Sequence, residues 1–229
     1  MLTNRYGRVD METVKKEKVN SEQAIMAAAE ELFMEHGYNL TTTTMIARQA
    51  GVTHAMLHYY FRTKEHIFIK VLDKNLNEMM SAFQPVMKKG APFWESMESG
   101  ISTYFDFLES HPKLPAFLYD TARFNPELID SYRPRIRNTL KKIIDFHSRM
   151  IREEASKGAV RDVDPVQLMI DIATLNLSTF ILLPAAQSLF SDEMSEEHIH
   201  RYIRERKKET IELIRSRLYS GLPDNPAKA

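Results

Sequence analysis

The stretch between Thr41 and Lys64 constrains the fold more than any other part of the chain, because it fits two short helices joined by a tight turn. The first helix ends at Gly51, a residue type that readily takes the left-handed backbone conformation found after helix ends. The second helix follows Thr53, a good N-cap residue, and directs Leu57 into the core. This spacing predicts a helix-turn-helix, a motif whose second helix can lie in the major groove of DNA.

The outward face of the second helix combines small, polar and aromatic side chains, which suits a close approach to a groove wall. Backbone N–H groups at a helix start bind phosphate well, so Thr53 marks one expected backbone contact, and Lys64 at the next helix start can pair with another phosphate. The same pattern also fits a small three-helix core with an ordinary solvated face, since short matches occur by chance. The candidate DNA-contacting residues are Thr43, Thr44, Thr53, His54, Ala55, Met56, His58, Tyr59, Tyr60 and Lys64.

With its flanks, this stretch resembles the N-terminal domain of TetR-family transcriptional regulators over residues 20–72, with no gaps in the spacing. That family carries an amphipathic helix ending in H/K-G-Y, then T-T, I-A-x-x-A-G-V-S/T and L-Y-x-H/Y-F-x-x-K-E. The chain departs from the family at His58, where Tyr is usual, and at Thr44, where Arg is frequent. The matching residues are His36-Gly37-Tyr38, Thr41-Thr42, Ile46-Ala47, Ala50-Gly51-Val52-Thr53, Leu57-His58-Tyr59-Tyr60-Phe61 and Lys64-Glu65.

The resemblance implies a homodimer in which a small N-terminal domain binds operator DNA and a larger helical domain binds an effector. Effector binding would shift the population toward a separation of the two DNA-binding domains that no longer matches the half-sites. The resemblance implies that the regulator represses transcription. We therefore expect a ligand-responsive transcriptional regulator whose partners are double-stranded operator DNA, a small hydrophobic or aromatic effector and a second copy of the chain.

The charge of the chain does not by itself indicate nucleic-acid binding, because 31 Lys and Arg residues balance 31 Asp and Glu residues. Any affinity for DNA must come from where the charges lie. The absence of Cys excludes disulfides, thiolate catalysis and Cys-based zinc sites. The sequence contains no phosphate-binding loop, nucleophile elbow or H-E-x-x-H motif. We accordingly predict a protein that is not an enzyme and that holds no cofactor or metal.

The chain divides into four parts on its patterns of apolar and charged residues. Residues 1–18 lack apolar periodicity and are predicted to be either a disordered tail or a basic arm. Residues 19–72 form the helix-turn-helix domain, whose first helix is predicted to start at a capping box of Asn20 and Gln23. Residues 73–220 form a helical domain for effector binding and dimerisation, and residues 221–229 form a second tail. No alternating strand pattern occurs, so we predict an all-α fold, a three-helix DNA-binding domain plus a larger helical bundle, with about nine helices in total.

Aromatic and Met side chains become frequent after residue 75, and several of them could line a cavity for a flat or greasy molecule. The resemblance implies such a pocket between the helices of the second domain. The alternative for each of these residues is an ordinary place in a helical core. Polar groups that could orient a ligand are His111, Asp120, Arg123, His147 and Asn176. The candidate ligand-binding residues are Trp94, Met97, Tyr104, Phe117, Asp120, Phe124, Phe146, Met150, Met169 and Asn176.

The last two predicted helices are apolar around more than one face, which favours a partner beyond the chain's own core. By the family resemblance, that partner is the same helix pair of a second subunit. The alternative is packing onto one subunit only. The candidate dimer-interface residues are Leu168, Ile172, Leu175, Thr179, Leu182, Tyr202, Ile203, Thr210 and Leu213.

The location of the protein is expected to be cytoplasmic, with no membrane partner. The N-terminus is polar and charged, unlike a signal peptide. The longest apolar run, Phe180 to Leu183, precedes Pro184 and is shorter than the roughly 20 residues of a membrane span. Two functional alternatives stay open: a helical small-molecule carrier that has lost operator binding, and an enzyme built in a helical bundle.

Overall fold

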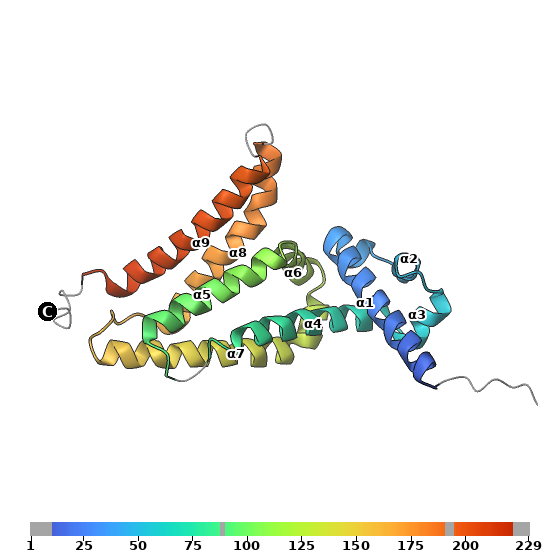
Figure 1. The fold of residues 1–229 in the computed structure, drawn as a ribbon, viewed down its shortest axis with the longest axis horizontal. Helices are drawn as coiled ribbons and strands as arrows, with labels where there is room; N and C mark the ends of the chain where they lie inside the picture. The colour runs from blue at the N-terminus through green and yellow to red at the C-terminus, as the bar shows by residue number, and fades with distance from the viewer. Residues whose placement is uncertain (1–10, 88–89, 191–194, 222–229) are drawn as a thin grey trace, which may run out of the picture. The chain divides into compact units, whose positions relative to one another are not determined.

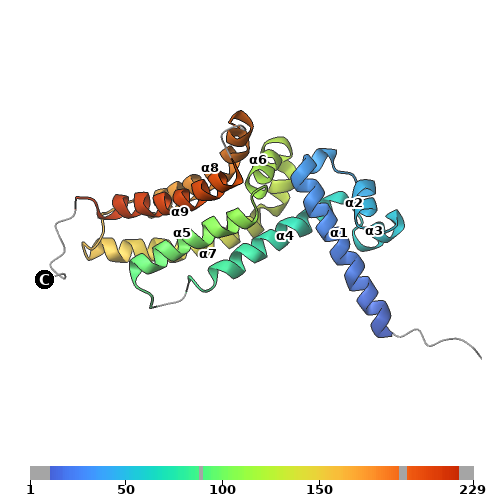
Figure 2. The same cartoon turned by 45° about the horizontal axis from the view of Figure 1, so that its top comes forward.

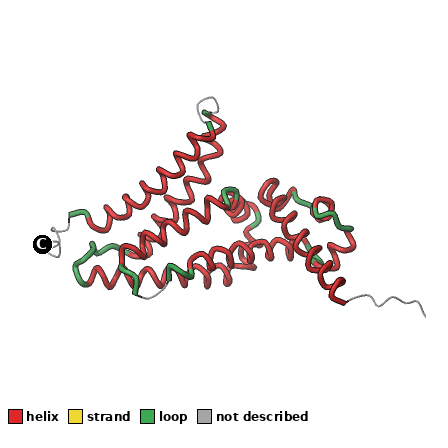
Figure 3. The backbone as a smooth tube through the Cα atoms, viewed as in Figure 1, coloured by secondary structure: helices red, strands yellow, loops and turns green. Residues whose placement is uncertain are grey.

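The computed structural model describes residues 11–87, 90–190 and 195–221, and within them it contains helices and loops but no strand (Figure 3). The predicted all-α class is therefore confirmed, with nine helices in the described ranges. The chain divides into an N-terminal unit, Met1–Lys74, and a C-terminal unit, Asn75–Ala229. The sequence placed the corresponding boundary between residues 72 and 73.

The N-terminal unit consists of three helices and the beginning of a fourth, which continues past the boundary into the C-terminal unit (Figure 1). The helices are α1 (Met11–Leu40), α2 (Thr43–Gln49), α3 (His54–Tyr60) and α4 (Lys64–Phe83).

Helix α1 begins earlier than the sequence predicted. Met11 is its first residue, so part of the stretch predicted as a tail is helical, and residues 1–10 lie outside the described residues. Asn20 lies inside α1 and does not start it, so the predicted capping box was wrong. Residues 11–19 include three Lys and two Glu, which have high helix propensity, and contain no Gly or Pro. The apolar stripe therefore marks where the helix packs rather than where it begins.

The core of the N-terminal unit is built on aromatic rings. The ring of Phe68 on α4 meets the rings of Phe33 and Tyr38 edge-on, with centroids 5.7 Å and 5.2 Å apart. Ile46 of α2 and Leu57 of α3 are fully buried. Each helix of this unit thus contributes an apolar side chain to the interior, which fixes how α2 and α3 lie against α1 and α4.

The C-terminal unit contains the remaining five helices, and α8 and α9 run side by side in both views of it (Figures 1 and 2). Its main core cluster joins α5, α7, α8 and α9 through buried aliphatic side chains, with Met97, Ile101, Ile151, Leu168, Ile172, Ile214 and Leu218 among them. The bounds are α5 (Phe93–Ser110), α6 (Leu114–Phe124), α7 (Pro126–Ser156), α8 (Pro165–Leu189) and α9 (Glu196–Tyr219).

The starts of α8 and α9 follow from local sequence. The side chain of Asp164 accepts a hydrogen bond from the backbone N–H of Gln167 at 2.7 Å, directly before Pro165 at the first helical position. Ser195 caps α9 in the same way, accepting from the N–H of His198 at 3.3 Å.

Helix α8 is apolar over a longer stretch than the run from Phe180 to Leu183 on which the prediction of no membrane span was based. Pro184 lies inside it and does not end it, so the apolar run before that proline is part of one 25-residue helix. By length and composition alone, α8 could cross a membrane, and 28% of its most apolar window is buried. Core helices of soluble proteins pass the same test. The low burial leaves α8 with apolar surface that the chain does not cover.

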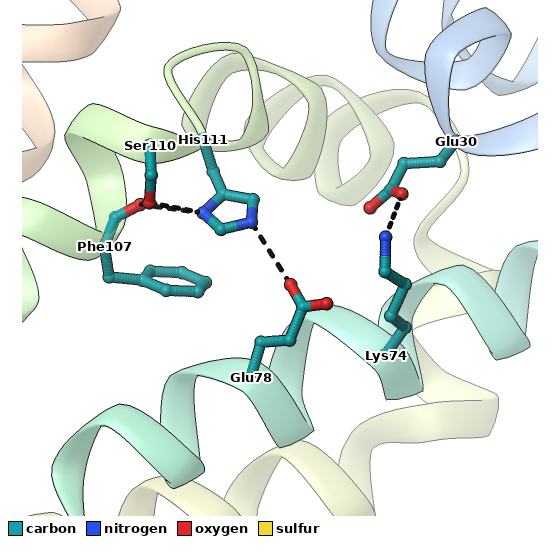
Figure 4. Close-up of polar contacts among 6 residues, drawn as sticks. All are labelled: Glu30, Lys74, Glu78, Phe107, Ser110 and His111. Carbon is teal, nitrogen blue, oxygen red and sulfur yellow. Dashed lines mark hydrogen bonds and ion pairs between the residues drawn. The ribbon is translucent and has the colours of Figure 1, made fainter. Parts of the chain in front are cut away.

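Side chains on α4 tie it to its neighbours within each unit (Figure 4). In the N-terminal unit, Lys74 forms an ion pair with Glu30 of α1. In the C-terminal unit, Glu78 contacts Nε2 of His111, the residue that ends α5, at 3.2 Å. The Nδ1 atom of His111 lies 2.9 Å from the carbonyl oxygen of Phe107, and the two rings stack. These pairs are partly exposed, so they position α4 and add little to stability.

Candidate nucleic-acid interface and ligand cavity

The helix-turn-helix is held by two threonine caps. The hydroxyl of Thr42 accepts from the N–H of Met45 at the start of α2, and that of Thr53 accepts from the N–H of Met56 at the start of α3, each at 3.2 Å. Gly51 lies between the helices with a φ of 67°, a conformation that side chains with a β-carbon disfavour. The caps and the glycine therefore fix where α3 begins and which of its faces points outward.

Helix α3 has one buried face and one open face. Leu57 is fully buried and Tyr60 is half-buried, whereas Tyr59 is 69% exposed. On α2, Thr43 is half-buried and Thr44 is exposed. The other candidate DNA-contacting side chains of α3 are all exposed, namely His54, Ala55, Met56 and His58. The structure thus gathers these candidates on one accessible surface, which we call the α3 face.

The two histidines of the α3 face are held by neighbours. Nε2 of His54 lies 3.0 Å from the hydroxyl of Thr43, and its ring meets that of His58 edge-on with centroids 4.4 Å apart. Nδ1 of His58 donates to the carbonyl oxygen of Arg62 at 3.2 Å, because a carbonyl can only accept. With Nδ1 as the donor, Nε2 of the neutral His58 ring is an acceptor. The sequence analysis did not single out Arg62, which is exposed directly after α3.

Lys64 is engaged inside the N-terminal unit, which differs from the outward role expected from its position at a helix start. Its ammonium donates to the carbonyl oxygens of Tyr38 at 2.9 Å and Thr41 at 3.0 Å, and it lies 4.1 Å from the centroid of the Tyr38 ring. Burial lowers the pKa of Lys64. Since an ammonium has three N–H bonds, one remains for a phosphate. The side chain of Lys64 therefore joins the end of α1 to the start of α4.

A cavity of about 300 Å³ lies in the C-terminal unit among α4, α5, α7 and α8. Its walls are aliphatic and aromatic side chains and Met, and the only polar side chains among them are those of Tyr104 and His147. The volume is at the lower end of the range of roughly 300–1,000 Å³ found for small-molecule sites. The lining residues are Met79, Phe83, Met97, Gly100, Ile101, Tyr104, Leu140, Ile143, Ile144, His147, Val166, Met169, Ile170, Ile172, Ala173 and Leu177.

Three of the candidate ligand residues line this cavity: Met97, Tyr104 and Met169. Phe146 and Met150 line a second, more polar hollow that also contains Arg149.

The other five candidates lie outside both hollows. Trp94 packs edge-on against Tyr219 with centroids 6.0 Å apart, and Phe117 is buried. The amide N–H of Asn176 donates to the carbonyl of Ile101 at 3.4 Å. The remaining two, Asp120 and Phe124, are exposed on α6.

His147 is the most unusual group in the cavity wall, since its side chain is only 2% exposed. Its Nδ1 donates to the carbonyl of Ile143 at 2.9 Å, one turn earlier on α7, while Nε2 has no hydrogen-bond partner within the described residues. Burial lowers the pKa of His147, which keeps the ring neutral. Burial also raises the pKa of Tyr104 to about 12, so the phenol stays protonated.

The sequence analysis missed Gly100, which makes the position of His147 possible. A β-carbon added at Gly100 would lie 2.9 Å from Nε2 of His147. A glycine inside a helix costs about 1 kcal/mol relative to alanine. Its place in the middle of α5 was the available signal, since such a glycine often marks a close approach by another group.

The comparisons with known proteins agree with this geometry. Residues 25–71 match the family model of bacterial regulatory proteins of the tetR family. A fatty acid metabolism regulator protein from Bacillus subtilis is 26% identical over 154 residues, which are 67% of this chain and 77% of that protein. The transcriptional regulator RutR from Escherichia coli K12 is 27% identical over 151 residues, 66% of this chain and 69% of its own. The chain belongs to the TetR family.

The fold of this TetR-family protein is also that of solved regulators. The structure of FadR from Bacillus subtilis in complex with stearoyl-CoA matches with a TM-score of 0.63 at 22% identity, covering 86% of this chain and 99% of that one. A TetR-like regulator from Rhodococcus matches with a TM-score of 0.63 at 15% identity, covering 86% of this chain and 94% of that one. At these identities the likeness shows the fold alone.

The candidate dimer residues of the TetR-family chain fall into two groups. Leu182, Tyr202 and Leu213 are exposed, and Leu175 is half-buried against the core. The sequence analysis did not name Ile181 and Leu189, two further exposed apolar residues of α8. The other five candidates are buried within the chain itself, namely Leu168, Ile172, Thr179, Ile203 and Thr210.

The internal role of Lys64 leads to a stability prediction. Lys64→Met removes two charged hydrogen bonds and leaves the carbonyls of Tyr38 and Thr41 without this donor, so we expect the free energy of unfolding to fall by about 1–3 kcal/mol. Urea unfolding followed by circular dichroism measures the change. Lys70→Met alters an exposed lysine of the same helix and is the matched control. Equal stability of the two variants would refute the internal role.

The lowered pKa of His147 leads to a pH prediction. Below the ordinary imidazole pKa of about 6.5, the unfolded chain takes up a proton that the buried ring resists, so native stability falls as the pH falls through this window. Above this pH window, the ring is neutral in both the folded and the unfolded chain, so His147 does not make stability depend on pH. Urea midpoints measured from pH 7.5 down to about pH 5 should therefore fall less in His147→Leu than in the native protein. His200→Leu, at an exposed histidine, should keep the native pH dependence.

Proposed function

We propose that this TetR-family transcriptional regulator is a cytoplasmic homodimer that binds operator DNA through the α3 face. A small apolar effector in the cavity of the C-terminal unit would release it, which makes it a repressor. The observation that carries the proposal is the α3 face itself, an open row of side chains on a helix whose start is fixed by the Thr53 cap. Such a helix can enter a major groove without rearrangement.

The contacts with DNA divide into two kinds. Thr44, Thr53 and Tyr59 carry hydroxyl groups at exposed positions, where they can bind phosphate and set the register of the helix. Ala55 and Met56 are exposed apolar side chains, which suit contact with thymine methyl groups. His54 and His58 carry ring nitrogens that can form hydrogen bonds with base edges. The neutral overall charge predicts modest non-specific affinity, so specificity depends on this local surface.

The cavity supports an apolar effector. Its walls offer almost no hydrogen-bonding groups, so a charged ligand would lose its hydration without compensation. A fatty acid metabolism regulator protein from Bacillus subtilis and the solved structure of FadR from the same organism with stearoyl-CoA are consistent with an apolar ligand class for this fold.

Helix α4 is the proposed link between effector and DNA. It contributes Met79 and Phe83 to the cavity wall, and it contributes Phe68 to the core of the N-terminal unit. A ligand that fits the cavity better in one position of α4 would shift the population toward that position. The coupling is reciprocal, so operator DNA would lower the affinity for the effector by the same factor.

The homodimer is proposed to form through the exposed apolar residues of α8 and α9. A two-fold pair presents two α3 faces to a pseudo-palindromic site, with half-sites separated by about one helical turn of 34–36 Å or a multiple of it.

The DNA proposal is tested by fluorescence anisotropy with DNA from upstream of the protein's own gene, at several salt concentrations and with excess random competitor. Tight binding that survives competitor and weakens with salt supports it. Where this DNA is not bound, selection of binding sites from random-sequence DNA decides the question. Ligand binding without any sequence-specific DNA binding would instead favour the carrier alternative.

Tyr59→Phe removes one hydroxyl from the α3 face and should weaken binding about 10- to 100-fold for every operator sequence, since a hydrogen bond to a charged group is worth about 1.5–3 kcal/mol. Tyr119→Phe makes the same change at an exposed tyrosine of α6 and should bind like the native protein. Anisotropy titrations of the two variants provide the comparison. Equal affinities would remove Tyr59 from the interface.

Leu182→Glu places a charge on the apolar surface of α8 and should convert the dimer to a monomer at micromolar concentration, measured by sedimentation. Leu182 is 62% exposed in the chain, so the substitution should leave the fold intact. Phe124→Glu is the matched control, because Phe124 is 60% exposed on α6. A native protein that sediments as a monomer, or a Leu182→Glu variant that remains a dimer, would contradict the proposed interface.

A further inference from the structure

The cavity of the C-terminal unit is long, as the spacing of its lining residues on α8 shows. Val166, Ile170, Ala173 and Leu177 all line it, and residues three or four apart share one face of a helix. We call these four residues the α8 stripe. Its first and last members are eleven residues apart, so at about 1.5 Å per residue the stripe is about 16 Å long. The cavity therefore follows one side of α8 for about three turns.

The volume of the cavity then sets its width. A volume of about 300 Å³ spread over a length of about 16 Å corresponds to a mean cross-section of about 19 Å², which is a channel about 5 Å across. Non-bonded carbon atoms approach one another to about 3.5–4.0 Å, so a single methylene chain fills such a channel. A cage-like or highly branched skeleton is too wide for it. The dimensions therefore favour one unbranched chain.

The number of carbon atoms in that chain follows from the volume and, separately, from the length. An apolar cavity of ~150 Å³ accepts the six carbons of benzene, so about 300 Å³ accepts about a dozen. An extended alkyl chain advances about 1.25 Å per carbon, given bonds of about 1.5 Å and angles of about 111°, so a length of about 16 Å takes about 13 carbons. The two counts agree, which is expected of a straight chain and not of a compact ligand.

The walls of the cavity suit an alkyl chain along their whole length. The residues that α4, α5 and α7 contribute are mostly aliphatic or Met, among them Met79, Ile101 and Ile144. Met side chains are flexible and adapt to an irregular apolar surface. The lining residues include no Lys, Arg, Asp or Glu, so a charged group on the ligand would find no counter-charge inside. Such a group must stay outside the cavity.

The cavity opens to solvent near the start of α8. Val166 and Ile170 line it and yet are 44% and 51% exposed, and Leu140 of α7 is a third lining residue at 40%. Large apolar side chains that are exposed together mark a place where an apolar ligand is received. A chain can enter past them, and a polar group at its end can remain in water.

We propose that the cavity binds one unbranched alkyl chain of about a dozen carbons, which enters past Val166 and Ile170 and leaves its polar end in water. The inference rests on the proposed function only in taking this ligand to be the effector. It adds the shape and length of the ligand. It also makes Ala173 the residue that sets the chain length, because Ala173 is the smallest side chain of the α8 stripe and lies inside it.

A chain-length series measures the length of the channel. The full-length protein is titrated by calorimetry with straight-chain carboxylates of six to sixteen carbons, each below its micelle concentration. Each added methylene should raise the affinity about three- to fourfold up to about twelve carbons. Longer chains should gain little, because their extra carbons stay in water. Nonspecific adsorption would raise the affinity steadily to sixteen carbons, and that result would overturn the inference.

A compact ligand tests the shape of the channel. 1-Adamantaneacetate has as many carbons as dodecanoate, but they form a cage that exposes about as much apolar surface as the chain of octanoate. It should bind at least tenfold more weakly than octanoate, because the cage is wider than the channel. Binding as tight as that of octanoate would contradict a narrow channel.

Ala173→Leu assigns the chain length to the α8 stripe. Ala173 lies seven residues, or about 10 Å, along α8 from Val166, so a larger side chain there should block the channel after about eight carbons. Octanoate should bind within about threefold of its native affinity, and dodecanoate should lose at least tenfold. Ala122→Leu makes the same change at an exposed position of α6 and should keep the native series. Thermal unfolding confirms that both variants are folded. An unchanged series in Ala173→Leu overturns the role of Ala173.

The outcomes separate this inference from the proposed function. Failure of every chain to bind overturns the inferred ligand class. Binding of operator DNA without ligand is measured on the same samples, and its result decides whether the protein is a regulator. A chain that binds with the expected length dependence but does not release operator DNA supports the inferred site and refutes its role as the effector site.

Discussion

Helix α4 is the element on which both halves of this protein depend, because it is part of two interiors at once. At its beginning, Lys64 and Phe68 hold it to α1, by hydrogen bonds to backbone carbonyls and by edge-on contact with Phe33. Toward its end, Met79 and Phe83 form part of the cavity wall. In the proposed mechanism, α4 is therefore the helix through which a ligand in the cavity would influence DNA binding.

The internal engagement of Lys64 changes how a neutral protein can be expected to bind DNA. The ammonium of Lys64 uses two of its three N–H bonds for the carbonyls of Tyr38 and Thr41. In the proposed interface, the other candidate groups for contact are the hydroxyls, the ring nitrogens of His54 and His58, and the peptide N–H groups at the start of α3, together with the exposed Arg62. Most of these are uncharged, so they depend on short, directed hydrogen bonds and on a fixed helix orientation. The two threonine caps and the Phe68 cluster supply that orientation.

The sequence predicted the parts of this structure that depend on local patterns. Thr53, Gly51 and Leu57 define the helix-turn-helix within a dozen residues, and Asp164 with Pro165 defines the start of α8 in two. The predicted start of α1 at Asn20 was wrong because the residues before Asn20 are polar helix formers, which continue the helix without adding to its apolar stripe. The cavity was harder to predict because its walls come from four helices. Composition indicated aromatic and Met side chains, but the wall is largely aliphatic, and nothing local distinguishes Ile143 or Ile170 from core residues.

Helix α8 is apolar on several faces because it contributes to the core, lines the cavity and carries exposed apolar residues. Leu168 and Ile172 belong to the core cluster, Met169 and Ala173 line the cavity, and Leu182 remains exposed. A helix with three such roles has little surface left for charged residues, and Asp171 is the one charged residue in α8. This explains a composition that would also suit a membrane span. The same residues cannot serve the core and a partner at once. The buried members of the predicted interface therefore stabilise the subunit, and only the exposed ones are available to a second copy.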